Sequence, residues 1–329
     1  PDPANWGSAF GVNDADSDGV INPANASGEI PKPLFRAFGR EKADVDSHTY
    51  TSATTWSQPI TTAPIIIRHC TQTKPGYLVI FGTGRYLAET DADNTEYQSV
   101  YAIWDYGDAV DDYLGDFQRG AGPVGEDVFS NPLHPPSVTL MQQWVQWWGA
   151  NPYNANENLR VLTDNQPDWE TFDVSENPKA DAGWYFDLPI SKERVVRELV
   201  YRNGILIFIT SMPETDPCSA GGRSIIHEID ACTGGRLDTA QFDINDDGVI
   251  DENDMISIAN PLWGQPDEPE FIWVAPSGIE IDAMVFPPVI LLMPGGETET
   301  KYFITSGGGV VAVTEIADQR GLFFWRYNR

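Results

Sequence analysis

The sequence predicts an all-β fold of the sandwich, barrel or propeller type, and three observations lead to this prediction. Apolar and β-branched runs of about five residues recur along the chain, bounded by glycine, proline, asparagine or aspartate. The 329 residues include 29 glycines and 25 prolines, which favours many turns and excludes long uninterrupted helices and coiled coils. No apolar run reaches the roughly 18 residues that a membrane-spanning helix needs.

The expected strands follow one another with short turn signals between them. Asn203-Gly204 lies between two apolar runs, and this dipeptide favours a two-residue β-hairpin turn. Gly-rich segments separate the last strands in the same way. The strands are expected at 65–68, 77–81, 100–105, 193–201, 205–210, 225–229, 289–293, 301–305 and 310–314.

One segment has helical spacing. Trp144, Trp147 and Trp148 stand at i, i+3 and i+4 within residues 137–149, which predicts a helix with its aromatic face on the sheet. The alternative is a binding platform formed by the same rings.

Long polar stretches at 1–58, 106–135 and 149–180 are interpreted as insertions on the β scaffold. No strict repeat is visible. The segments 77–105 and 205–230 share one pattern, in which an apolar strand and a Gly turn precede a strand that ends in an acidic residue. Divergent propeller blades have this pattern, so it favours a propeller.

The chain is strongly acidic, with 49 aspartates and glutamates against 20 lysines and arginines and a net charge of −29. Such a surface repels phosphate, which excludes nucleic acid and anionic membranes as partners. It favours cations, above all divalent metals. The first residues have neither the basic nor the apolar region of a secretory signal, so a cytosolic protein and an exported protein in its mature form are both compatible.

One segment, 243–254, has the spacing of an EF-hand calcium loop. Gly248 at position 6 permits the sharp turn, and six of the twelve residues are acidic. Position 12 is aspartate, whose arm is shorter than that of the usual glutamate. The expected oxygen ligands of a Ca²⁺ ion are Asp243, Asn245, Asp247, the Val249 carbonyl, Asp251 and Asp254.

A second candidate calcium loop starts at residue 14 and repeats the Gly-Val-Ile centre of the first. Its alternative interpretation is a solvated acidic segment. The two loops are too far apart in the sequence to pair as EF-hands do, so each is expected to bind calcium separately on the β scaffold. The expected ligands of the second loop are Asp14, Asp16, Asp18, Val20 and Asn22.

The chain has three cysteines in no zinc-binding pattern. Cys218 and Cys232 flank the expected strand at 225–229, and Cys70 lies far from both. A bridge around that strand and two unpaired thiols are both compatible with this spacing.

Five segments together carry a family pattern. Gly-Tyr-Leu-Val-Ile-Phe-Gly-Thr-Gly-Arg-Tyr-Leu at 76–87 precedes Ser-Val-Tyr-Ala-Ile-Trp-Asp at 99–105, and Gly-Trp-Tyr-Phe-Asp-Leu-Pro occupies 183–189. Thr-Asp-Pro-Cys-Ser-Ala-Gly-Gly at 215–222 and Glu-Ile-Asp-Ala-Cys-Thr-Gly-Gly-Arg-Leu at 228–237 lead directly into the calcium loop. With the C-terminal stretch 307–326, they resemble the C-terminal domain of the PilY/PilC proteins of type IV pili.

The resemblance implies a modified β-propeller over residues 59–329, preceded by a segment at 1–58 that carries the second loop. It implies a calcium-dependent, non-enzymatic adhesin and pilus biogenesis factor, exported through the periplasm to the pilus tip or cell surface, that governs pilus extension, retraction and attachment. Pilin or minor pilins, and a host or surface ligand, would be the partners. The family ligands carry over to Asp243, Asn245, Asp247, Val249 and Asp251; Asp254 is added from loop spacing.

Two further expectations depend on the resemblance. An exported location predicts that Cys218 and Cys232 are bridged and that Cys70 is bonded to neither. The upstream blades of the family have no counterpart here, so the chain would be the C-terminal blades of an incomplete propeller. The missing portion would be removed by cleavage or supplied by another chain.

Two other function classes compete with the pilus role. Quinoprotein dehydrogenases also combine propellers with calcium, but the chain lacks an adjacent Cys-Cys pair. A secreted glycan-binding propeller that uses surface tryptophans is the other alternative.

Overall fold

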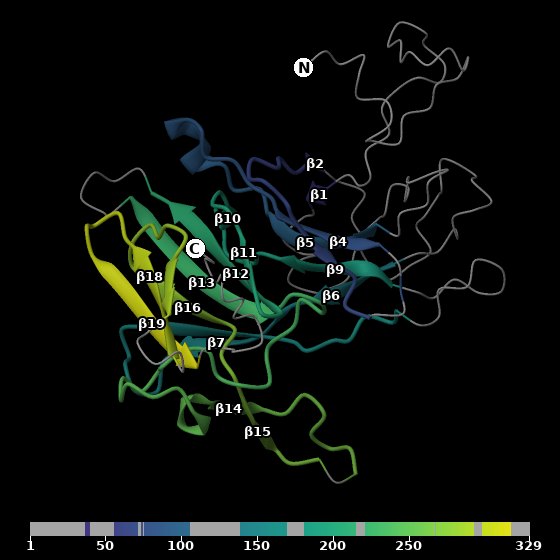
Figure 1. The fold of residues 1–329 in the computed structure, drawn as a ribbon, viewed down its shortest axis with the longest axis vertical. Coiled ribbons are helices and arrows are strands. Elements are labelled where there is room, and N and C mark those ends of the chain that lie inside the picture. Colours follow the sequence, from purple (N-terminus) through teal and green to yellow (C-terminus); the bar gives the residue numbers. More distant parts are fainter. Residues whose placement is uncertain are drawn as a thin grey trace, which may run out of the picture.

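The computed structural model describes residues 37–39, 56–71, 74, 76–105, 139–169, 181–214, 221–266, 268–292 and 298–316. Within these residues the chain is almost entirely β, with nineteen strands and two short 3-10 helices, Glu89–Asp93 and Glu252–Asp254. Figure 1 shows the strands gathered into layered sheets, which do not close into a ring in the described part of the chain. This confirms the all-β class.

A five-stranded sheet is formed largely by the first half of the chain, in the order β3-β4-β5-β9-β6. All its pairs are antiparallel except β6 with β9. Expected strands at 65–68, 77–81 and 100–105 are confirmed here. The bounds are β3 Ile65–Arg68, β4 Tyr77–Gly82, β5 Ser99–Asp105, β6 Thr139–Gln143 and β9 Asp181–Asp187.

A seven-stranded antiparallel sheet lies against it, in the order β10-β12-β13-β16-β8-β7, with β11 also paired to β12. The expected Asn-Gly hairpin joins β11 to β12, with Asn203 at φ +52° and Gly204 at φ +90°. The bounds are β7 Val145–Ala150, β8 Asn158–Leu162, β10 Arg194–Val195, β11 Val200–Arg202, β12 Ile205–Pro213, β13 Gly222–Asp230 and β16 Gly278–Ile281.

Smaller sheets complete the described fold. A three-stranded antiparallel sheet, β17-β18-β19, matches the three strands expected near the C-terminal end, and a two-stranded hairpin, β14-β15, follows the acidic loop. Two further short strands, β1 and β2, pair with each other. The bounds are β1 Phe38–Gly39, β2 Trp56–Ser57, β14 Ile256–Ala259, β15 Phe271–Val274, β17 Val289–Leu292, β18 Thr298–Ile304 and β19 Val310–Ile316.

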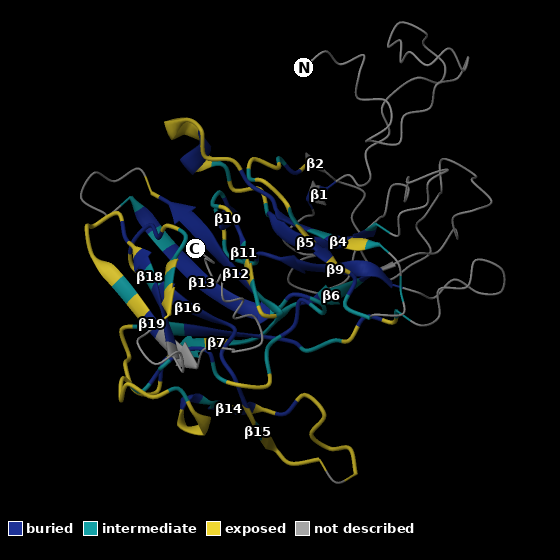
Figure 2. Cartoon of the chain, in the orientation of Figure 1, coloured by how far each residue is buried: buried dark blue, intermediate teal, exposed yellow. Residues whose placement is uncertain are grey.

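Strand β12 shows why the central sheet is buried on both faces (Figure 2). Successive side chains of a strand point to opposite faces. Leu206 and Phe208 therefore join the cluster shared with the five-stranded sheet, whereas Ile207 and Ile209 join the cluster beneath β14, β15 and β18. This arrangement explains why β12 is a continuous apolar run rather than an alternating one.

A buried ionic cluster lies within the central sheet. The Arg160 guanidinium on β8 donates to both Glu193 carboxylate oxygens, at 2.6 and 3.1 Å, and both side chains are fully buried. Arg160 also lies 3.1 Å from Nε2 of His227, whose ring stacks on Phe208 with centroids 4.3 Å apart. Burial and the Arg160 charge hold the pKa of His227 well below its ordinary value. His227 is thus a packed core residue.

The helix expected at 137–149 is wrong. The described part of that segment forms β6 and β7 instead, and β7 pairs with β8 through a register shift between Val145 and Trp147. The register shift interrupts the alternation of side chains between the two faces of β7. The tryptophans at 144, 147 and 148 therefore have the spacing of a helix although they lie in an extended segment. The single strand expected at 193–201 is likewise two short strands, β10 and β11.

The disulfide prediction is also wrong, because Cys232 is bonded to Cys70, with Cα atoms 5.8 Å apart. Cys70 follows β3, and Cys232 occupies the turn after β13. Packing of the five-stranded sheet on the central sheet brings these two strand ends together, and the Trp184 indole on β9 donates to Ala231 of the same turn at 3.1 Å. Cys218 lies outside the described residues.

Candidate functional site

The acidic loop at 243–254 is flanked at both ends by buried apolar residues. Phe242 and Ile244 at its start, and Ile256 and Ile258 just after it, belong to the cluster beneath the central sheet. Asn151 reinforces the first anchor, because its side-chain amide donates to the Ile244 carbonyl at 2.9 Å. The loop between the anchors is therefore held at both ends while its acidic tip faces solvent.

The first half of the loop is wound around its own side chains. The Asp243 carboxylate accepts from the amides of Asp247 at 3.2 Å and Gly248 at 2.8 Å. The Asn245 side-chain oxygen also accepts from the Asp247 amide, at 2.9 Å, and Asp247 in turn accepts from Val249 at 2.9 Å. Positions 1, 3 and 5 of the expected loop are thus brought together by one short run of backbone.

Backbone conformation at the tip explains two residue choices. Asp246 has φ +60° and Gly248 has φ +84°. Aspartate tolerates this left-handed region better than most residues, and glycine adopts it freely. The turn at position 6 therefore has the form that the sequence predicts.

Asp254, at position 12, closes the loop from inside. Its side chain is fully buried, and it accepts from the amides of Ile244 at 2.9 Å and Asp251 at 2.9 Å, which stand at opposite ends of the loop. Burial raises the pKa of the Asp254 carboxyl, and these amide bonds oppose the rise. Asp254 acts as a clamp between the two ends in this structure.

The second half of the loop forms a short 3-10 helix, Glu252–Asp254. Asp251 caps it by accepting from the Asn253 amide at 2.7 Å. Val249 is exposed, and Ile250 packs on the cluster below.

The donor set tests whether a calcium ion fits. Every expected ligand offers oxygen, which is the donor that Ca²⁺ takes. Positions 1, 3 and 5 already converge on one turn, and Asp254 spans the loop. Within the described ranges, however, no three His, Cys, Asp or Glu side chains form a group that could hold a metal ion. The residues fit calcium in chemistry and in order, and binding remains a prediction.

Other residues expected from the sequence have different outcomes. The second candidate loop, with Asp14, Asp16, Asp18, Val20 and Asn22, lies outside the described residues. Outside the expected ligands, the Asp91 carboxylate is paired with Arg85 at 2.8 Å and accepts from two backbone amides, so it stabilises its local turn.

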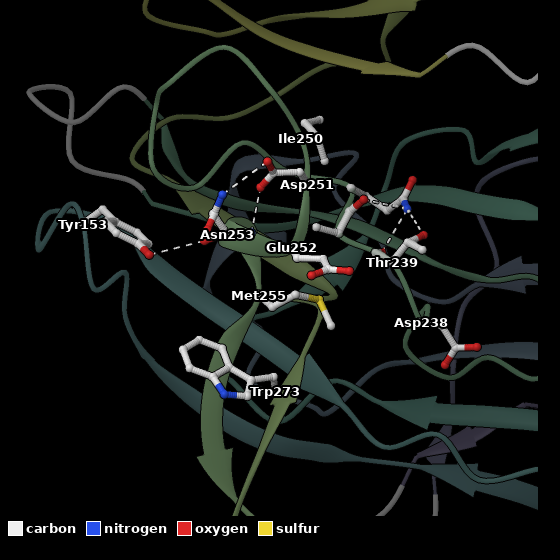
Figure 3. A pocket seen from close by; sticks show the side chains of 11 residues that line it. Tyr153, Asp238, Thr239, Ile250, Asp251, Glu252, Asn253, Met255 and Trp273 are labelled. Atoms are coloured by element: carbon white, nitrogen blue, oxygen red, sulfur yellow. Dashed lines mark hydrogen bonds between the residues drawn. The ribbon is translucent and has the colours of Figure 1, made fainter.

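Sequence reasoning missed what surrounds the loop. Tyr153 donates its hydroxyl to the Asn253 carbonyl at 3.3 Å, across 100 positions of sequence. Tyr153 and Trp273 line a cavity beside the loop with Asp238, Glu252 and Met255 (Figure 3). The sequence contains no local pattern for this cavity apart from its aromatic residues, because the cavity walls come from segments that are distant in sequence.

Comparison with known proteins adds the family context. Residues 9–123 match the sequence model of the PilY1 beta-propeller domain, a match that crosses the domain boundary expected at 58. The crystal structure of the Pseudomonas aeruginosa PilY1 C-terminal domain resembles the fold with a TM-score of 0.58 at 22% identity, over 87% of this chain and 48% of that one. The chain is therefore similar in fold to the PilY1 C-terminal domain.

Curated PilY1 proteins are similar to the chain in sequence. The type IV pilus biogenesis factor PilY1 of Pseudomonas aeruginosa strain UCBPP-PA14 is 26% identical over 257 residues, covering 73% of this chain and 20% of that protein. A PilY1 homolog of Xylella fastidiosa is 30% identical over 176 residues, covering 52% of this chain and 11% of that protein. The chain thus spans a fifth or less of the PilY1 relatives it matches here.

The PilY1 comparisons confirm the expected β-propeller class. The relatives are named as pilus biogenesis factors rather than as enzymes. In the described part of the chain, no helix has the length and apolar character needed to cross a membrane.

Proposed function

We propose that this chain is part of a type IV pilus biogenesis factor that is exported to the cell surface. There it would act at the pilus tip as a non-enzymatic adhesin, with pilin or minor pilins as partners and a host or surface ligand as target. The observation that carries the proposal is the homology to PilY1 over most of the chain, in sequence and in fold.

We further propose that the loop at 243–254 binds calcium through Asp243, Asn245, Asp247, the Val249 carbonyl and Asp251, with Asp254 as ligand or clamp. Six acidic side chains within twelve residues repel one another at neutral pH. A bound cation would offset that repulsion and hold the loop closed.

The packing of the loop ends indicates how calcium occupancy could alter the β14–β15 hairpin. Its start packs in the cluster beneath the central sheet, and its end runs directly into β14. Loop closure would therefore fix the β14–β15 hairpin, and a partner that contacts only the fixed form would bind in a calcium-dependent way. Pilus extension and retraction would be regulated through this equilibrium.

Calorimetry with a matched pair of variants tests the calcium site. Asp247→Ala removes an expected ligand and should lower the calcium stoichiometry by one. Asp246→Asn removes one charge from the same turn at a position without an expected ligand role, and asparagine tolerates the φ of +60° there, so it should leave the stoichiometry unchanged. Calcium at 100 times its dissociation constant should raise the free energy of unfolding by about 2.7 kcal/mol. Equal stoichiometry in wild type and Asp247→Ala would refute this site.

The native host tests the pilus role. The double variant Asp243→Ala/Asp247→Ala should change the number of surface pili and twitching motility, whereas Asp246→Asn should not. Unchanged pili and motility in a folded, expressed double variant would refute the switch and leave calcium, at most, a stabiliser. Deletion of the whole protein with no effect on pili or attachment would refute the biogenesis role itself.

A further inference from the structure

A lysine and a glutamate from two different sheets meet in the interior of the molecule. Nζ of Lys301 on β18 donates to Oε2 of Glu228 on β13 at 2.5 Å, and the two side chains are 1% and 0% exposed. Strand β13 belongs to the central sheet and β18 to the three-stranded sheet, and in the described part of the chain no strand of one sheet pairs with a strand of the other (Figure 1). The contact is therefore a buried polar link between two separate sheets.

Apolar side chains surround this pair. In the β12–β13 ladder, Glu228 stands opposite Ile207, and in the β18–β19 ladder, Lys301 stands opposite Val313. Residues that stand opposite each other in an antiparallel ladder share one face of the sheet. Both apolar partners belong to the buried cluster beneath the central sheet, and so does Phe303, two positions after Lys301 on the same face of β18. The amine and the carboxyl group therefore lie in a medium of low polarity.

The charges of the pair are poorly compensated there. Among the described residues, Oε1 of Glu228 is buried without a hydrogen-bond partner, although a carboxylate oxygen has two lone pairs to satisfy. Burial raises the pKa of the Glu228 carboxyl, the Lys301 charge opposes the rise, and the charge of Glu299 adds to it. Glu299 is itself buried on β18 and is held by Arg202, whose Nε donates to Oε1 at 2.5 Å.

These conditions favour the neutral forms of both groups. Transfer of one proton from Lys301 to Glu228 removes two charges from the interior, where each charge costs several kcal/mol of lost hydration. The products of the transfer are a free amine and a carboxylic acid. These are the reactive forms for amide formation, because the amine has regained its lone pair and the acid has gained a hydroxyl that can leave as water.

We propose that Lys301 and Glu228 condense into an isopeptide bond that joins β13 to β18. After the proton transfer, the Nζ lone pair attacks Cδ of Glu228 and a C–N bond forms. The tetrahedral adduct then breaks one C–O bond, and its hydroxyl group leaves with a second proton from Nζ as one molecule of water. The products are a secondary amide and water, and the step consumes no oxidant, reductant or external reactant.

The surroundings also favour the amide over the ion pair once it has formed. The reaction replaces two buried charges with one neutral amide, and it releases water from an apolar interior. Both strands already belong to packed sheets, so the two reacting groups are held in contact without further loss of chain entropy.

Mass spectrometry of the whole chain, after reduction of the disulfide, tests the proposal. The wild-type protein, followed during incubation at neutral pH, should become lighter than its sequence by the mass of one water molecule. Lys301→Arg keeps the positive charge but replaces the amine with a guanidinium that stays protonated, so this variant should keep its full sequence mass. The matched control is Lys192→Arg, the same change at the solvent-accessible ion pair with Asp93, and it should lose one water as the wild type does.

Two further measurements locate the bond. Trypsin should not cleave the wild type after Lys301, and tandem mass spectrometry should identify a branched peptide that joins this lysine to Glu228 in the segment 224–236. In denaturing gels, the wild type should migrate faster than Lys301→Arg, because the bond closes a loop across 73 positions.

Two results would overturn the proposal. A wild-type chain that keeps its full sequence mass throughout, with cleavage after Lys301, would leave the pair as an ordinary buried ion pair. A loss of water that persists in Lys301→Arg would place the dehydration elsewhere in the chain. The first result needs the wild-type protein alone, so it decides the question even where the variant fails to fold.

Discussion

Replacing Glu193 with glutamine should destabilise the fold by about 3–5 kcal/mol, because it leaves the buried Arg160 guanidinium without its counter-charge. Both side chains are fully buried, and the two hydrogen bonds between them measure 2.6 and 3.1 Å. Glutamine turns one acceptor oxygen into a donor facing the guanidinium, so one charge-assisted bond worth about 1.5–3 kcal/mol is lost. The bond that Thr210 donates to Glu193 at 2.7 Å is weakened as well.

Urea unfolding followed by tryptophan fluorescence measures this loss. The matched control is Asp93→Asn, the same change of carboxylate to amide at an exposed ion pair with Lys192, 3.7 Å apart. That variant should lose less than about 1 kcal/mol.

A second variant distinguishes loss of the Arg160–Glu193 attraction from the cost of leaving the Arg160 charge buried without a partner. Arg160→Met combined with Glu193→Gln removes the buried cation and should be more stable than Glu193→Gln alone. A Glu193→Gln variant within about 1 kcal/mol of wild type would show that the ion pair does not stabilise the central sheet.

Three further outcomes are expected. Cys70→Ala should lower the free energy of unfolding by about 5 kcal/mol, because the bond spans 162 positions. Non-reducing peptide mapping should link Cys70 to Cys232, and two free thiols there would contradict the pairing. The lowered pKa of His227 means that the unfolded chain binds a proton that the folded chain does not, so stability should fall as pH drops below about 6.5. His227→Phe should give a shallower fall between about pH 6.5 and 5.5 in urea titrations, and parallel curves would exclude this linkage. Gly204→Ala should cost about 1–2 kcal/mol in thermal unfolding because φ is +90°, whereas an unchanged midpoint would mean that the turn relaxes without strain.

Strands were predictable where apolar runs ended at strong turn signals. Tyr77–Gly82 and the Asn203-Gly204 hairpin followed directly from composition and turn chemistry. The segment at 139–150 was not predictable, since tertiary pairing with β8 and β9 outweighed the helical spacing of its tryptophans. Local patterns carry no information about such partners.

The candidate site also has features that were predictable from the sequence and features that were not. The order of residues at 243–254 was enough to place the turn at Gly248 and the side chains wound around it. The clamp at Asp254 and the cavity beside Trp273 depend on burial and on distant segments, which spacing does not encode. The bond from Cys70 to Cys232 was missed for that reason too.

That bond has a mechanical consequence. It joins the end of β3 in one sheet to the turn after β13 in the next, so a pulling force that reaches both cysteines passes through covalent bonds rather than through the hydrogen bonds between them. The intervening chain could otherwise extend by about 550 Å. Tension could then extract only strands outside the two cysteines, such as β3 and β16, while the chain between Cys70 and Cys232 would not extend until the bond is reduced. The bond thus gives the domain a redox-dependent limit on its extensibility.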